Sequence, residues 1–140
     1  METYRKLTSE EFEAALALRI KVFVDEQNVP LEEEHDKFDE QAVHFGIFHG
    51  ETLVGTGRLL TQGKEAKVGR VAILKGFRGE GLGSKLLELM LAEAKEKGCT
   101  ECIVDAQLQA IPFYSRLGFV AEGDEFLDGG IPHRRMRLRL

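Results

Sequence analysis

The segment RVAILKGFRGEGLGSKLLELM, residues 70–90, constrains the fold more than any other part of this chain. A short apolar run leads into a loop with four glycines, and a leucine-rich segment follows. This order predicts a strand, a tight turn and a helix, and the first backbone N–H groups of such a helix have no partner within it. Because these groups and the helix dipole attract negative charge, the segment favours a phosphate-binding site.

A purely structural turn would also account for these glycines, whereas two nucleotide-binding motifs fit them poorly. A Walker A loop requires Gly-x-x-x-x-Gly-Lys-Ser/Thr, but here Leu82 follows the second glycine of the pair Gly76 and Gly81. A dinucleotide-binding fingerprint requires Gly-x-Gly-x-x-Gly, but its last position holds Ser84. A nucleotide-binding protein is therefore kept only as an alternative.

Composition and charge disfavour several classes of protein. The chain has 140 residues, 43% hydrophobic and 31% charged, which is typical of one globular domain spanning residues 1–140. Its net charge of −5 argues against nucleic acid as a partner, because such binding depends on neutralising phosphates. Without an apolar run of about 18 residues or a signal-peptide core, we expect no membrane association and a cytoplasmic location. The four histidines and two cysteines show no metal-ligand spacing, so no metal is expected, and Cys99 and Cys102 are expected to be structural thiols.

Apolar periodicity and turn residues predict the order of the elements. Strands are expected at residues 3–7, 43–49, 52–60, 67–74, 102–106, 119–122 and 134–140. A capping box of Thr8 and Glu11 begins a first helix, a second covers 81–97, and Pro112 begins a third that Gly118 ends. The acidic loop, residues 27–41, is expected to contain a helical turn or two and to be solvated. The order predicts an α+β fold with a mixed, mostly antiparallel sheet.

Two motifs resemble one known family. The pattern Arg-x-x-Gly-x-Gly, residues 78–83, resembles the pyrophosphate-binding loop of the GNAT family of acetyl-CoA-dependent N-acetyltransferases, and AIPFYSRLGF, residues 110–119, resembles a second family motif. LRIKVFVDEQNVP, residues 18–30, and FLDGGIPHRRM, residues 126–136, resemble a bacterial subgroup with VFV-x-EQ and GIPH signatures. The resemblance implies the GNAT fold, with helices on both faces of the sheet. It also implies that strands 67–74 and 102–106 run parallel and splay apart around the pantetheine arm.

The resemblance also implies a cosubstrate, acetyl-CoA, and roles for individual residues. Backbone groups of Val71, Ala72 and Ile73 would pair with the pantetheine arm, and an N–H there would stabilise the developing oxyanion. Tyr114 would be the general acid that protonates the departing thiolate. The pyrophosphate would be held by Arg78, Gly79, Glu80, Gly81, Leu82, Gly83 and Ser84.

The sequence does not decide which residue is the general base or which amine is the acceptor. Glu26, His44 and His133 are candidates for the base or for acceptor contacts. Gln107 stands where many relatives have asparagine, which puts in doubt any contact carried over from that position. The acidic side chains of the acidic loop could attract a cationic acceptor such as a polyamine or an aminosugar. These side chains are Glu32, Glu33, Glu34, Asp36 and Asp39.

We therefore expect a single-domain N-acetyltransferase that moves acetyl from acetyl-CoA to a primary amine of a small molecule or peptide by direct attack. One alternative is an acyltransferase that uses a longer acyl thioester, and another is a non-catalytic acyl-CoA-binding module. A homodimer formed through a strand edge is also considered.

Overall fold

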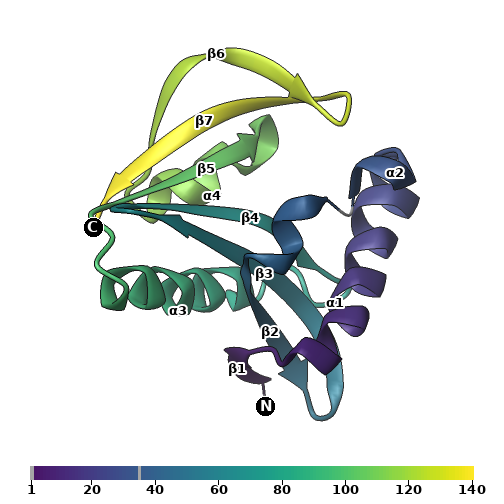
Figure 1. The fold of residues 1–140 in the computed structure, drawn as a ribbon. Helices are drawn as coiled ribbons and strands as arrows, with labels where there is room; N and C mark the ends of the chain where they lie inside the picture. Colours follow the sequence, from purple (N-terminus) through teal and green to yellow (C-terminus); the bar gives the residue numbers. More distant parts are fainter. Residues whose placement is uncertain (1, 35) are drawn as a thin grey trace.

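The computed structural model describes residues 2–34 and 36–140. Seven strands form one sheet in the order β1-β2-β3-β4-β5-β7-β6 (Figure 1); β4 and β5 pair in parallel, and the other described neighbours are antiparallel. The predicted α+β class with a mixed, mostly antiparallel sheet is confirmed. The strands are β1 (Glu2–Lys6), β2 (Val43–His49), β3 (Thr52–Gln62), β4 (Glu65–Ile73), β5 (Glu101–Gln107), β6 (Val120–Asp128) and β7 (Ile131–Arg139).

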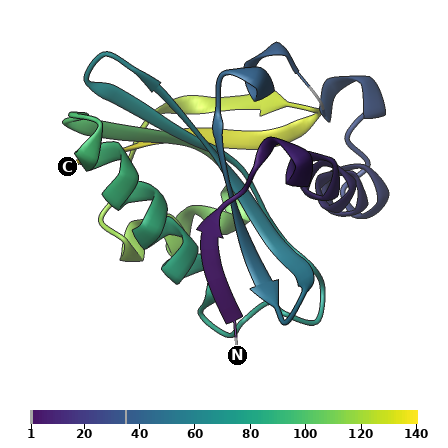
Figure 2. The same cartoon turned by 60° about the horizontal axis from the view of Figure 1, so that its bottom comes forward.

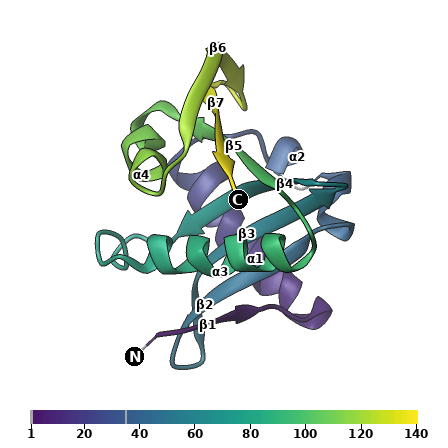
Figure 3. The ribbon, with the colours of Figure 1, turned by 90° about the vertical axis from the view of Figure 1, so that its left-hand side faces the viewer.

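Helices cover both faces of the sheet, as expected. Figure 2 shows α1 (Phe12–Arg19) and α3 (Leu82–Glu96) on opposite sides of the central strands, and Figure 3 shows α4 (Ile111–Arg116) beside the strands β5–β7. The shorter helical segments are η1 (Ser9–Glu11), η2 (Ile20–Glu26), α2 (Leu31–Glu34), η3 (Lys37–Glu40) and η4 (Leu108–Ala110). No helix in the described part of the chain is long and apolar enough to cross a membrane.

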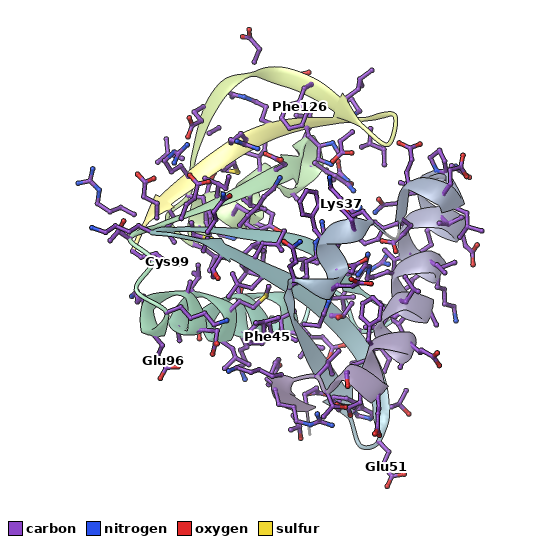
Figure 4. The ribbon with its side chains drawn as sticks, in the orientation of Figure 1. Lys37, Phe45, Glu51, Glu96, Cys99 and Phe126 are labelled. Carbon is purple, nitrogen blue, oxygen red and sulfur yellow. The ribbon has the colours of Figure 1, made fainter. Side chains whose placement is uncertain are left out.

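The main core lies between the sheet and α3. The leucines that recur along α3 are the reason for its position, since Leu86, Leu87 and Met90 are fully buried in that core. Phe45, labelled in Figure 4, belongs to the same core from β2. Gly57 of β3 lets the helix approach, because a Cβ there would lie 3.0 Å from the sulfur of Met90. Burying each large apolar side chain contributes about 1.5–3 kcal/mol, so α3 is firmly fixed to the sheet.

The parallel pair β4–β5 separates part of the way along its length. Pairing runs from Glu65 opposite Glu101 to Val68 opposite Val104 and does not continue to the ends of the strands. Figure 1 shows β4 and β5 close together at one end and apart at the other. The register of β3 against β4 also shifts, so that Gly57 alone stands opposite two residues, Arg70 and Val71. Such a β-bulge bends the strand that carries the extra residue, which accounts for the splay.

Two local predictions were incomplete, and one helix has an unexpected form. The first helix includes Val22 and Phe23, as its apolar pattern indicated, but from Ile20 onward it is η2, a wider, π-type segment. The strand expected at 119–122 extends to Asp128, because Gly129 and Gly130 form the tight turn of a β6–β7 hairpin. The acidic loop contains the expected helical turns, α2 and η3, but it is not simply solvated.

Both cysteines are free thiols at the junction of α3 and β5. Cys99, labelled in Figure 4, and Cys102 are 5% and 0% exposed. Burial raises the pKa of Cys102 to about 12. The two residues therefore pack as small apolar side chains, as expected.

Candidate functional site

The glycine loop, residues 74–81, connects β4 to α3. Gly76, Gly79 and Gly81 have φ values of 103°, 81° and 79°, in the left-handed region that strains other residues. A Cβ on any of the three would meet no atom within 4 Å, so space is open around the loop. Gly81 precedes the helix without a side chain to cap it. The N–H groups of the first turn of α3 are therefore available to a ligand.

The first helical residues after this loop also have packing roles. Leu82 is 5% exposed and belongs to the main core. A Cβ on Gly83 would lie 3.3 Å from side-chain atoms of both Ile73 and Phe113, so glycine allows the helix to begin close to β4 and α4. These two positions can offer a ligand only their backbone groups.

Arg78 and Glu26, predicted for different roles, lie together. Arg78 donates from Nε to the carbonyl of Ile73 at 2.7 Å. Its Nη2 donates to both carboxylate oxygens of Glu26, at 2.9 and 3.1 Å. The end of η2 is thereby joined to the glycine loop, and the guanidinium predicted to bind pyrophosphate is paired with a carboxylate.

The backbone predicted to bind the pantetheine arm lies beyond the last β4–β5 pair. Val71, Ala72 and Ile73 have β3 on one side, and β5 does not pair with them on the other. The side chain of Ala72 packs with Leu18 and Val22 beneath α1 and η2. Core packing therefore occupies this side chain and leaves the β5-facing edge of β4 open.

A cavity of about 1010 Å³ lies where β4 and β5 separate. It is enclosed by the acidic loop and by the β6–β7 hairpin; Figure 4 labels one residue of each, Lys37 and Phe126. Of the residues predicted for catalysis, Tyr114 and His133 line the cavity, whereas Glu26 and His44 do not. Of those predicted to bind the cosubstrate, only Val71 lines it; the predicted pyrophosphate residues, 78–84, lie outside it. The predicted acceptor residues that line it are Glu32, Glu33, Glu34 and Asp36.

Tyr114 lies at the edge of this cavity and is 6% exposed. Its ring packs edge-on against Phe113 and Phe119, with centroids 5.0 and 5.6 Å away. Burial raises the pKa of the phenol above its ordinary value. The hydroxyl is therefore protonated at neutral pH and can act as a proton donor.

His133 and His44 differ in what their ring nitrogens can do. His133 Nδ1 lies 2.6 Å from the carbonyl of Ile131, and because a carbonyl only accepts, Nδ1 carries the proton and leaves Nε2 as a base. His44 uses Nε2 to donate to the carbonyl of Asp39 at 2.9 Å and packs on Phe12. Burial lowers the pKa of His44. His44 therefore connects β2 to the acidic loop, which is a structural role.

Two carboxylates of the acidic loop are buried, contrary to the expected solvated face. Glu34 and Asp39 are 1% and 4% exposed, and Arg19 of α1 is 1% exposed. Arg19 donates from Nε to both oxygens of Glu34 at 3.1 and 3.0 Å, and from Nη1 to Asp39 at 2.8 Å. These carboxylates hold the loop onto the sheet and are not free to attract a cationic acceptor.

A second arginine completes the buried ion network. Arg58 of β3 donates to Asp36 at 2.7 and 3.0 Å and to Asp39 at 3.0 Å. Burial alone would raise the pKa of Asp39, but hydrogen bonds and charge from Arg19 and Arg58 lower it to about 2. Arg19 falls on the apolar side of the first helix, and its distant partners explain how a charged side chain can be buried there.

Three glutamine side chains at the cavity are joined by hydrogen bonds that were not predicted from the sequence. Gln107, at the end of β5, donates to Gln27 Oε1 at 2.7 Å, and Gln109 donates to Gln107. All three line the cavity. One indication of this arrangement was present in the sequence, which was Gln107 at a position where many relatives have asparagine.

Comparison with known proteins agrees with this geometry. Residues 5–140 match the family model described as an acetyltransferase (GNAT) domain. The chain is 39% identical over 128 residues to an uncharacterized N-acetyltransferase, YjcF, of Bacillus subtilis, covering 91% of each chain.

Two solved structures share the fold. A putative N-acetyltransferase from Lactobacillus plantarum has a TM-score of 0.89 and 27% identity, over 100% of this chain and 97% of that one. An acyl-CoA N-acyltransferase from Pseudomonas aeruginosa has a TM-score of 0.81 and 31% identity, over 99% and 98%. With its splayed parallel strands and glycine loop, the chain belongs to the GNAT acetyltransferase family.

Proposed function

We propose that this protein transfers an acetyl group from acetyl-CoA to the primary amine of an acceptor by direct attack. The observation that carries the proposal is the splay of β4 and β5, which leaves one strand edge open between the glycine loop and the cavity. A thioester placed in the splay would be reached by an amine from the cavity.

The cosubstrate side is supported by backbone geometry. The open edge of β4 can pair with the amide groups of a pantetheine arm, which resembles a short peptide. The uncapped start of α3 and Arg78 suit the pyrophosphate, because both supply donors and positive charge to an anion. The similar Pseudomonas aeruginosa structure, described as an acyl-CoA N-acyltransferase, supports an acyl-CoA cosubstrate here.

The reaction needs one proton donor and one proton acceptor. A protonated acceptor amine first gives up one proton to solvent. The neutral nitrogen then attacks the carbonyl carbon, a C–N bond forms and the C–S bond breaks. We assign Tyr114 to protonate the thiolate and His133 Nε2 to take the proton of the amine, because both residues line the cavity and His133 uses its other ring nitrogen, Nδ1, to contact the carbonyl of Ile131. Glu26 remains an alternative base only if it leaves Arg78. Backbone N–H groups of β4 near Val71 would stabilise the oxyanion.

The acceptor is proposed to be an amine that carries positive charge. Glu32, Glu33 and Asp128 line the cavity, and such carboxylates raise the local concentration of cations. The buried carboxylates Glu34 and Asp39 are excluded from this role because arginines neutralise them.

Ligand-dependent thermal unfolding tests the cosubstrate. A ligand at about 100 times its Kd stabilises the folded state by roughly 2.7 kcal/mol. We expect acetyl-CoA and CoA to raise the melting temperature, and ATP and NAD to leave it unchanged. A larger shift with long-chain acyl-CoA would favour the longer acyl donor, and the absence of any shift with CoA compounds would refute the proposal.

Thiol release from acetyl-CoA with a panel of amines then tests catalysis. Tyr114→Phe should lower kcat by about 100-fold or more while CoA still shifts the melt, because a general acid contributes roughly that much. Tyr4→Phe, on edge strand β1, is the matched control and should leave kcat unchanged. A binding module without catalytic activity would show CoA binding and no turnover in any of the three proteins.

A further inference from the structure

Arg70 has an unusual backbone conformation at the centre of the site. Its φ is 51°, and among the described residues other than glycine only Asn28 also has a positive φ. Asparagine tolerates this conformation, whereas a long side chain such as arginine rarely adopts it. Arg70 is in the β4 bulge, two residues after Val68, where pairing with β5 ends. Strained residues persist only where surrounding contacts enforce them, and they concentrate at functional sites.

The contacts that enforce this conformation come from the acidic loop. Arg70 Nε donates to the carbonyl of Glu34 at 3.2 Å, and Nη2 donates to the carbonyl of Glu33 at 3.2 Å. Nη2 also reaches Asp36 at 3.3 Å. The two carbonyls belong to α2, which is only four residues long, and that of Glu34 also accepts from Arg19 Nη2 at 2.8 Å. Arg70 therefore ties the bulge to the end of this short helix.

The loop at the other end of this connection is itself held firmly. Arg19 binds the Glu34 carboxylate, and Arg58 binds Asp36, so the groups that Arg70 contacts are fixed to α1 and β3. Arg19 and Arg58 face three carboxylates, those of Glu34, Asp36 and Asp39, so Arg70 supplies the third positive charge of the cluster. Charge balance does not explain why this cation stands at a residue with positive φ, where glycine would avoid the strain. What the Arg70 side chain adds is a connection between the β4 bulge and the acidic loop.

We propose that Arg70 is a positioning residue for acetyl transfer: its side chain ties the β4 bulge to the acidic loop, so that the backbone N–H groups of the bulge point at the thioester carbonyl. This inference rests on the proposed function, because it assumes that the thioester lies in the splay. The acidic loop then has two roles, because it borders the acceptor cavity and also helps to activate the thioester.

Isotope-edited infrared spectroscopy of bound acetyl-CoA tests the inference without knowledge of the acceptor. A hydrogen bond to the thioester carbonyl lowers the stretching frequency of a ¹³C-labelled carbonyl, so wild-type protein should show a red shift. Arg70→Gly keeps the left-handed backbone and removes the tie. It should bind acetyl-CoA within about threefold of wild type and show a clearly smaller red shift. With an amine substrate, kcat should fall by about 10- to 100-fold, as expected when an oxyanion donor is misplaced.

Two further variants make the test specific. Arg134→Ala is the matched control, because Arg134 also binds a backbone carbonyl, that of Gly123, but does not line the cavity. Its red shift should equal that of wild type. If Arg70→Gly does not fold, Arg70→Asn replaces it, since asparagine also adopts positive φ. An unchanged red shift in whichever Arg70 variant folds overturns the inference while the proposed function stands. If wild-type protein binds no acetyl-CoA, the proposed function fails first.

Discussion

The glycine loop and the acidic loop border the same splayed strands, yet they are built in opposite ways. The glycine loop depends on backbone conformation at Gly76, Gly79 and Gly81, and the space around these glycines is open. The acidic loop depends on side chains, and its Glu34 and Asp39 are buried against Arg19. The first loop leads into a helix start whose backbone N–H groups no side chain caps, and the second uses its charges within the protein.

The two loops therefore contribute different properties: the glycine loop contributes ligand binding, and the acidic loop contributes rigidity. Unpaired N–H groups at a helix start contribute little to folding and remain available to a phosphate. Buried ion pairs contribute little net stability when complete, but removing one partner leaves a charge without compensation. Changes in the acidic loop should therefore affect stability first, and changes beside the glycine loop should affect ligand binding first.

The largest effect is expected from Asp39→Ala. This change leaves Arg19 and Arg58 buried without the carboxylate that both of them bind, and it should lower the free energy of unfolding by about 3–5 kcal/mol. Urea unfolding monitored by circular dichroism measures it. Glu40→Ala, at the exposed neighbouring position, should stay within about 0.5 kcal/mol. A loss below about 1 kcal/mol for Asp39→Ala would mean that the network is effectively solvated.

A smaller effect, on binding alone, is expected from Arg78→Ala. Hydrogen bonds to charged groups contribute about 1.5–3 kcal/mol, so the Kd for CoA should rise by roughly 10- to 100-fold in isothermal titration calorimetry. The unfolding midpoint without ligand should hardly change, because the pair with Glu26 is exposed. Arg5, on the distant strand β1, forms a similar exposed pair with Glu11. Arg5→Ala breaks that pair and should leave the Kd unchanged. Equal Kd values for the two variants would remove Arg78 from the binding site.

The smallest effect is expected from Glu26→Gln. In the free protein Glu26 competes with an incoming pyrophosphate for Arg78, so removing its charge should tighten CoA binding by up to about fivefold. The same titration measures it, with Glu11→Gln as the control for a distant pair of the same kind. Weaker binding would show that Glu26 helps to hold Arg78 in its binding orientation. Loss of turnover with intact binding would make Glu26 the base in place of His133.

Much of the fold was predictable because it follows from local patterns. The leucine repeat of α3, the capping box at Thr8 and the turn glycines act within a few residues of the chain, and the structure contains each of them. The splay of β4 and β5 came from the family resemblance and is also present. The order of the strands within the sheet was not predicted.

The acceptor side was predicted less well, because its contacts join distant segments. Arg19 and Asp39 are 20 residues apart, and Gln27 and Gln107 are 80 apart. No local pattern indicates which charges will be buried together. The strained backbone of Arg70 was likewise not predictable, since it depends on the carbonyls of α2, which lie more than 30 residues earlier in the chain.

The buried thiols have a practical consequence for enzymology. A thiol with a pKa of about 12 is ionised in only about one molecule in 10⁵ at pH 7, and the thiolate is the form that attacks disulfide reagents. Cys102 is fully buried and Cys99 nearly so, which also limits access of a reagent to either sulfur. A colorimetric assay that traps the free thiol of the released coenzyme can therefore be run on the native protein, and any signal that precedes the addition of substrate would report unfolding.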